Sequence, residues 1–141
     1  MKKTAHTAFA YAIAALTAGF LYRIYTEGMG FEGTTRLSVL HTHLFTLGML
    51  FFLLVLVLER LFPLGEAKIY KPFYWVYNLG VLITTLALTA RGIADVAIGK
   101  NLSTSLDKSI AGVAGIGHIL LSVGLVFFFI ALGKVVEGNK K

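Results

Sequence analysis

The sequence predicts an all-α membrane protein built as a bundle of four transmembrane helices. Of its 141 residues, 57% are hydrophobic and only 14% are charged, whereas soluble domains carry about 25% charged residues. The apolar residues are also concentrated in long uninterrupted blocks. These two observations exclude a water-soluble enzyme of ordinary composition, and they exclude a membrane β-barrel, whose strands alternate apolar and polar positions.

Four stretches of the chain contain no Asp, Glu, Lys or Arg. An α-helix needs about 20 apolar residues to cross a hydrocarbon core of about 30 Å, and each stretch is of that length. The stretches are Thr4 to Tyr22, Val39 to Leu58, Pro72 to Ala90 and Ser109 to Gly133. With their flanking residues, we expect helices at about 4–25, 36–61, 72–97 and 106–135, forming one transmembrane domain over residues 1–141.

The first helix follows Met1-Lys2-Lys3 and also resembles a secretory signal peptide, with a basic start and an apolar stretch. We interpret it as a membrane span because its apolar run exceeds the usual length of a signal-peptide core. The segment Phe62-Pro63-Leu64-Gly65 is typical of a helix end and should stop the second helix.

The third helix is expected to carry a pair of opposite charges, Arg91 and Asp95, four residues apart. Before the fourth helix, Ser103, Thr104 and Ser105 are candidate N-caps.

The basic residues predict the orientation. Eight lie on the side of the N-terminus, the loop after the second helix and the C-terminus, and five lie on the other side. The positive-inside rule then places both termini in the cytoplasm, with the protein in a bacterial inner membrane. The net charge of +6 fits this topology and affinity for anionic lipid, and no nucleic-acid motif is visible. With no cysteine, disulfides, thiolate metal sites and covalently attached heme are excluded.

Three histidines lie inside the apolar runs: His41, His43 and His118. Ionisable residues inside a membrane are costly, so these are the first candidates for function. His6 lies at the membrane interface and is set aside.

His41 and His43 point about 200° apart around a helix, so they cannot bind one ion from one face. Gly48, seven residues after His41, would let a flat ligand such as a porphyrin approach the backbone. On the last helix, Gly115, His118 and Ser122 form one stripe. That stripe fits a ligand site, and it equally fits a helix-packing seam with a histidine donating a hydrogen bond.

Three arginines, Arg23, Arg36 and Arg91, lie at the outer ends of helices, on the side of His41 and His43. Arginine suits bidentate carboxylate binding, so they could hold heme propionates, although they could also simply anchor helix ends. Measured along the helix axis from the charged residue at the outer end of each span, His41 lies about 7.5 Å from Arg36, whereas His118 lies about 15 Å from Lys108. His41 and His43 differ in depth by only about 3 Å, so they could share a heme between two copies of the chain.

The segment from Arg36 to Phe45, with His41-Thr42-His43 at its centre, resembles the second helix of heme-copper oxidases and nitric oxide reductases. The resemblance implies that His41 ligates a low-spin heme. The oxidase core is similar to three four-helix units around a pseudo-threefold axis, so this chain resembles one unit. No His-Pro-Glu-Val-Tyr-like segment and no His-His pair is present, so a copper-heme centre is not expected. The whole chain also resembles an uncharacterised family of small bacterial four-helix membrane proteins.

These observations lead to the hypothesis of a b-type cytochrome that binds heme b noncovalently and serves electron transfer or redox sensing. His41 is the preferred ligand, opposite His43 of a neighbouring protomer or His118 of the same one. A homo-oligomer is expected, with a trimer favoured by the oxidase analogy. Two alternatives stay open: a small copper- or zinc-binding transporter, and a cofactor-free accessory subunit.

Overall fold

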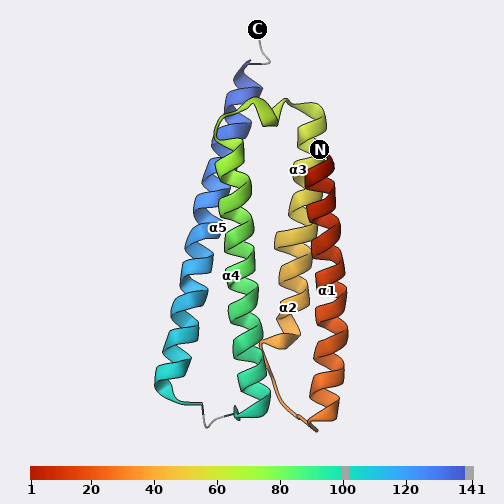
Figure 1. Ribbon diagram of the computed structural model, residues 1–141, viewed down its shortest axis with the longest axis vertical. Helices are drawn as coiled ribbons and strands as arrows, with labels where there is room; N and C mark the ends of the chain where they lie inside the picture. The colour runs from red at the N-terminus through yellow and green to blue at the C-terminus, as the bar shows by residue number, and fades with distance from the viewer. Residues whose placement is uncertain (100–101, 139–141) are drawn as a thin grey trace.

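Four long helices make up the structure, a computed structural model that describes residues 1–99 and 102–138 (Figure 1). The first span is α1 (Lys2–Gly28). The second consists of three consecutive segments, α2 (Leu37–His43), η1 (Leu44–Leu50) and α3 (Phe51–Leu61). The third span is α4 (Tyr70–Ala97) and the fourth is α5 (Thr104–Gly138), and a short 3₁₀ turn, η2 (Leu64–Glu66), precedes α4.

Each of the four spans is long and apolar enough to cross a membrane. The prediction of an all-α protein with four candidate spans is therefore confirmed. The spans begin and end within three residues of the ranges expected from the distribution of charge. The second span ends at Leu61, directly before the Phe62-Pro63 pair. Ser103 caps α5, because its Oγ accepts a hydrogen bond from the backbone N–H of Leu106 at 3.3 Å.

The beginning of α1, the turn η2 and the end of α5 lie at the same end of the bundle, which we call the η2 end (Figure 1). The connections from α1 to α2 and from α4 to α5 lie at the opposite end, which we call the Asp95 end. The cytoplasmic assignment of the η2 end stays a prediction. Three lysines that entered that prediction, Lys100, Lys140 and Lys141, lie outside the described residues.

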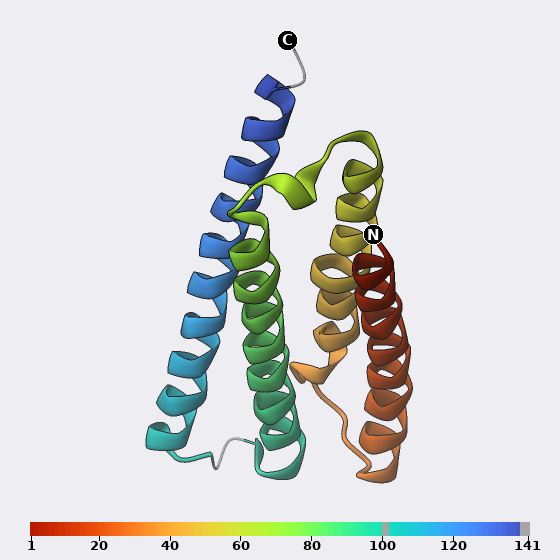
Figure 2. The ribbon, with the colours of Figure 1, turned by 45° about the horizontal axis from the view of Figure 1, so that its top comes forward.

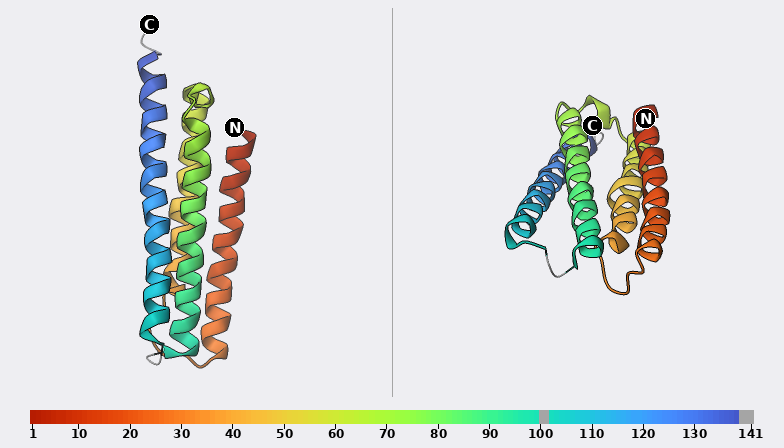
Figure 3. Two further views of the ribbon diagram at one scale, coloured as in Figure 1. Left: turned by 60° about the vertical axis from the view of Figure 1, so that its left-hand side comes forward. Right: turned by 60° about the horizontal axis from the view of Figure 1, so that its bottom comes forward.

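The middle of the bundle is formed by α4 and the second span, with α1 and α5 on opposite sides (Figures 2 and 3). Helix α5 packs mainly on α4, and α1 packs mainly on the second span. The central pair therefore lies between α1 and α5.

Glycines bring α4 and α5 into close contact. A Cβ atom at Gly80 would lie 2.6 Å from the backbone nitrogen of Leu121, and one at Gly124 would lie 2.8 Å from the Cα of Tyr77. Gly117 is equally close to Thr84. Small residues allow such close approach of membrane helices. The α4–α5 seam thus uses Gly117 and Gly124.

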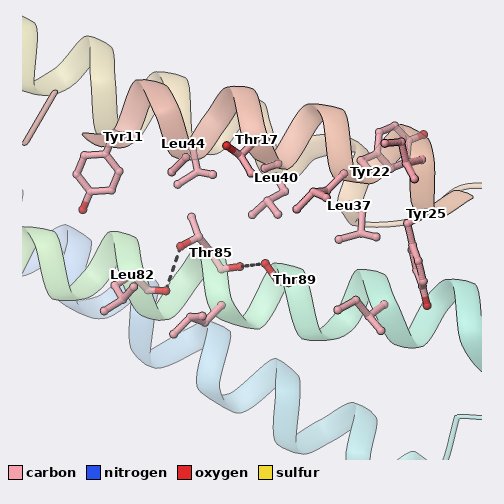
Figure 4. A pocket seen from close by; sticks show the side chains of 16 residues that line it. Tyr11, Thr17, Tyr22, Tyr25, Leu37, Leu40, Leu44, Leu82, Thr85 and Thr89 are labelled. Atoms are coloured by element: carbon pink, nitrogen blue, oxygen red, sulfur yellow. Dashed lines mark hydrogen bonds between the residues drawn. The ribbon is translucent and has the colours of Figure 1, made fainter. Parts of the chain in front are cut away.

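The two halves of the bundle differ in packing. In the η2 half, rings of Phe51, Phe52, Phe73, Tyr77 and Phe128 pack together, with stacked and edge-to-face contacts. The buried side chains of the Asp95 half are smaller, namely Ala15, Leu37, Leu40 and Leu44. The aromatic half is closed, whereas the leucine half leaves space between α1 and α4 (Figure 4).

The second span changes helical type in its middle. Segment η1 is π-helical, and such a turn inserts about one residue relative to an α-helix. The phenol of Tyr77 on α4 donates a hydrogen bond to the carbonyl oxygen of Leu47, 3.0 Å away, and so provides a partner for a backbone group of this segment. The insertion also changes the direction in which the side chains of α3 point, relative to His41 and His43 in α2.

Candidate functional site

His43 and His118 have the same local geometry. The Nδ1 of His43 lies 2.8 Å from the carbonyl oxygen of Val39, and the Nδ1 of His118 lies 2.8 Å from that of Ala114. A carbonyl oxygen can only accept, so Nδ1 carries the proton in both rings. In the neutral imidazole this tautomer leaves the lone pair of Nε2 free, which is the arrangement that histidine ligands of metals use.

The packing of the helices sets the relative depth of these histidines. Leu37 lies against Gly92 on α4, and Gly117 lies against Thr84 on the same helix. Measured from the level of Gly92, His43 is about 9 Å deep and His118 about 13 Å deep, a difference of less than one helical turn. His41 is only about 6 Å deep on the same scale.

His43 and His118 also face the same side of the central pair. Eight residues separate His43 from Phe51, and with the π-helical insertion they complete about two turns, so both lie on one face. Phe51 contacts Phe128 of α5. On α5, His118 precedes the buried Leu121 by three residues and is its neighbour on the helix surface.

His41 lies in the contact between α2 and α1. A Cβ atom built on Gly19 of α1 would lie 3.7 Å from the His41 ring. Its Nδ1 is buried and has no hydrogen-bond partner among the described residues. The structure thus separates His41, next to α1, from His43, on the side of α5, as their spacing predicts.

The two glycines expected beside a porphyrin have different surroundings. Gly48 is covered by the ring of Tyr11 from α1, and a Cβ atom there would lie 2.6 Å from Tyr11 Cδ1. A porphyrin contact at Gly48 would require this ring to move. A Cβ atom at Gly115 would have no heavy atom within 4 Å, so its face of α5 is open. Both porphyrin contacts stay predictions.

The three arginines predicted to hold propionates are paired with carboxylates of the chain. Arg23 Nε lies 2.8 Å from Glu27 Oε1, and Arg36 Nη1 lies 3.5 Å from Asp95 Oδ2. Arg91 Nε lies 3.2 Å from Asp95 Oδ1, which confirms the expected pair, and Arg91 also contacts Asp107.

The side chains of Arg23 and Arg36 are 78% and 55% exposed, whereas that of Arg91 is only 24% exposed. Among residues 1–99 and 102–138, the two exposed arginines keep guanidinium donors without a partner, and Arg91 lies between Asp95 and Asp107. Binding of propionates by any of the three stays a prediction.

Sequence reasoning missed a groove between α1 and α4 in the Asp95 half, whose floor is formed by Leu37, Leu40 and Leu44 (Figure 4). None of the three intramembrane histidines lines it. Its lining residues come from three spans, so only the tertiary arrangement shows it. The single local signal is the run of small residues in α1, among them Ala14 and Ala18, which line its wall.

Fold and site together define a four-span helical membrane protein with histidines inside the membrane. The model of a family described as a protein of unknown function (DUF2871) matches residues 1–135. The chain belongs to this family, in agreement with the expected uncharacterised family. No curated protein and no solved structure matches the chain. The resemblance of the second span to heme-copper oxidases therefore stays a prediction.

Proposed function

We propose that this protein is a membrane b-type heme protein in which His43 and His118 of one chain are the two axial ligands of heme b. One observation carries the proposal: both rings donate Nδ1–H to their own helix, at similar depth and toward the same side of α4. This assignment replaces His41 as the preferred ligand, because His41 lies toward α1 instead.

The exposure of these rings also supports a partner outside the chain. His118 is exposed on α5 and His43 is half-buried, although both belong to spans that lie in hydrocarbon. An imidazole with a free acceptor in lipid is costly, and such residues face a partner or a cavity. Iron coordination would satisfy both Nε2 atoms at once.

Bound heme would supply one-electron redox chemistry, and two protein ligands leave no open position for a substrate. The chain would hold the ring and keep water out through α2, α4 and α5. Electron transfer or redox sensing in a bacterial inner membrane is the role that follows from this proposal.

The alternative of a copper or zinc site finds less support. Catalytic and structural zinc sites use three or four protein ligands, and within residues 1–99 and 102–138 no three His, Cys, Asp or Glu side chains gather. A low-spin heme needs only two.

The test is the visible absorption spectrum of purified protein, oxidised and dithionite-reduced, for wild type and three single variants. We expect a sharp reduced α-band in wild type and in His41→Ala. We expect the band to be lost in His43→Ala and His118→Ala, and to return when imidazole is added. Each variant must keep its elution volume and its helical circular dichroism.

Other outcomes would contradict the proposal in distinguishable ways. A band lost in His41→Ala but kept in His118→Ala would favour a heme shared between protomers, as in the trimer that the oxidase analogy implies. A colourless wild type, expressed with sufficient heme, would overturn heme binding altogether. Metal analysis of the same colourless sample would then separate a copper or zinc protein from a cofactor-free subunit.

A further inference from the structure

A cavity at the η2 end of the bundle, separate from the groove, has a volume of about 320 Å³. It lies between the beginnings of α1 and α4 and the end of α3, and we call it the Lys3 cavity. Its lining includes two lysines, Lys3 and Lys71, and two aromatic side chains, Tyr74 and Trp75. Since one water takes up about 30 Å³ of liquid, the cavity has room for about ten waters or for a compact polar group.

The two lysines of this cavity carry positive charge without an acidic partner in the described part of the chain. Within residues 1–99 and 102–138, neither Lys3 nor Lys71 forms an ion pair. Lys3 Nζ instead lies 4.1 Å from the centroid of the Tyr74 ring and 4.5 Å from that of Trp75. A cation–π contact attracts a cation but leaves its net charge in place. The two lysines therefore favour an anion.

Glu59 is the only carboxylate among the lining residues that the structure describes, and its partners come from the chain itself. Its Oε1 accepts a hydrogen bond from the phenol of Tyr70. Its Oε2 lies 3.1 Å from the amino group of Met1, and the side chain is only 8% exposed. The charge of Glu59 is thus balanced by Met1, which leaves the charges of Lys3 and Lys71 in surplus.

Hydrogen bonds between spans hold the wall of the cavity in place. The phenol of Tyr74 shares a hydrogen bond with Thr7 of α1, and the phenol of Tyr70 donates to Glu59 of α3. Tyr74 is 8% exposed, and Thr4, which also lines the cavity, is 2% exposed. Because these groups are already ordered, a ligand would bind without the cost of ordering the wall.

The depth of the two lysines indicates the source of the anion. Lys3 directly precedes the charge-free run that begins at Thr4, and Lys71 directly precedes the run that begins at Pro72. Both lysines therefore lie at the edge of the hydrocarbon core, at the level of the phospholipid headgroups. Trp75 is 66% exposed beside them, and tryptophan is enriched at this interface. The phosphate of a surrounding phospholipid thus lies at the level of both amines.

We propose that the Lys3 cavity binds the phosphate of an anionic phospholipid, with Lys3 and Lys71 as its two cationic partners. Both lysines lie in the first turn of a helix, α1 and α4, where the positive end of the helix dipole adds to their charge. Basic pockets between transmembrane helices bind anionic headgroups in this way. A zwitterionic lipid would bring an ammonium group beside the lysines, so the surplus charge selects a lipid of net negative charge. The site shares no residue with the proposed heme ligands and does not depend on them.

The test uses Trp75, the only tryptophan of the chain, as a reporter inside the cavity lining. The full chain is placed in phosphatidylcholine vesicles with a small fraction of nitroxide-labelled lipid, either phosphatidylglycerol or phosphatidylcholine, with the nitroxide near the top of an acyl chain. A nitroxide quenches tryptophan fluorescence only at short range, so the ratio of quenching by the two lipids measures lipid preference at this position. We expect phosphatidylglycerol to quench several-fold more strongly than phosphatidylcholine at equal mole fraction.

Two double variants remove the same charge from the same end of the bundle. Lys3→Gln/Lys71→Gln removes both cations of the cavity, so the preference for phosphatidylglycerol should disappear. Lys2→Gln/Lys68→Gln is the matched control, because both lysines are exposed and lie outside the lining, and it should keep the wild-type preference. Equal loss in the two double variants would overturn the proposal, since general attraction to a basic surface would then explain the preference. So would the absence of any preference in wild type.

Lys71→Gln alone keeps the proposal testable if the double variant does not fold, because the Lys71 side chain is exposed. We expect it to reduce the preference part of the way, with unchanged elution volume and helical circular dichroism. Competition with inorganic phosphate at constant ionic strength separates the two sources of the anion. We expect the quenching of Trp75 by phosphatidylglycerol to persist, whereas its full reversal would show that soluble phosphate, and not a phospholipid, is the ligand.

Discussion

Two glycines on α5, two residues apart, should differ in their response to the same substitution. A Cβ atom at Gly117 would lie 2.8 Å from the backbone nitrogen of Thr84, whereas at Gly115 no heavy atom lies within 4 Å. We expect Gly117→Ala to destabilise the protein by about 1–3 kcal/mol through overpacking, and Gly115→Ala to leave stability within about 0.5 kcal/mol. The measurement is unfolding in detergent, followed by circular dichroism.

Equal stability of the two variants would show that α4 and α5 are not in contact at Thr84. Loss of oligomers in Gly115→Ala, with unchanged unfolding, would assign the open face of α5 to contact between copies. The sequence could not choose between these glycines: they face about 200° apart on the helix, and nothing in the sequence says which of the two faces packs against α4.

Histidine identities could be predicted from the sequence, but their surroundings could not. The cost of an ionisable group in hydrocarbon singles out His41, His43 and His118 without any structure. Which ring faces which helix depends on tertiary contacts: Gly19 lies next to His41, and only the register of α4 with α5 brings the depth of His118 close to that of His43. The distance along the helix from Lys108 to His118 does not give this relation, because it does not say how α5 is placed against α4.

At the scale of elements, the π-helical segment η1 depends on Tyr77. Its phenol donates to the Leu47 carbonyl at 3.0 Å, while its ring is 1% exposed and stacks on Phe51. Tyr77→Phe keeps the ring and removes the donor, so we expect a loss of about 1 kcal/mol in unfolding free energy. If the proposed heme is bound, its α-band should also shift, because the hydrogen bond stabilises the π-helical segment that directly follows His43.

Tyr22→Phe is the control for this variant, since its phenol has no hydrogen bond to any other described residue. Equal losses in both variants would mean that the bond to Leu47 does not stabilise η1. An unchanged spectrum in Tyr77→Phe, together with reduced stability, would separate the role of η1 in packing from a role in heme binding.

The spans themselves could be predicted well, because the absence of charge over about 20 residues is a direct consequence of the hydrocarbon core. The Phe62-Pro63 stop and the Ser103 cap follow from local chemistry and could be predicted as well. The π-helical insertion could not, since no local composition marks it. The groove could not either, because it arises where Leu37, Leu40 and Leu44 replace the aromatic rings of the other half.

At the scale of the whole molecule, the two halves differ in what they can accommodate. The η2 half is filled by rings from α1, α3, α4 and α5, of which Phe52 and Phe73 are fully buried. The Asp95 half contains the groove and the three histidines. At its end, Asp95 of α4 accepts hydrogen bonds from the Arg36 backbone N–H at 3.1 Å and from Arg91, and so links α4 to the start of the second span. The η2 half is thus filled by aromatic rings, whereas the Asp95 half leaves the groove open.

The orientation of this asymmetric molecule in the membrane decides from which side each ligand site is reached, and it can be tested directly. The chain has no cysteine, so single cysteines report position without background. Gly65 in η2 and Glu32 in the connection between α1 and α2 are both exposed and lie at opposite ends of the bundle.

With the η2 end in the cytoplasm, a membrane-impermeant maleimide should label Glu32→Cys in intact spheroplasts, and should label Gly65→Cys only after permeabilisation. The reverse pattern would contradict the positive-inside assignment, which rests on a margin of eight basic residues to five. In the expected orientation, His43 and His118, the proposed heme ligands, lie in the outer half of the membrane, about 9 and 13 Å from the level of Gly92.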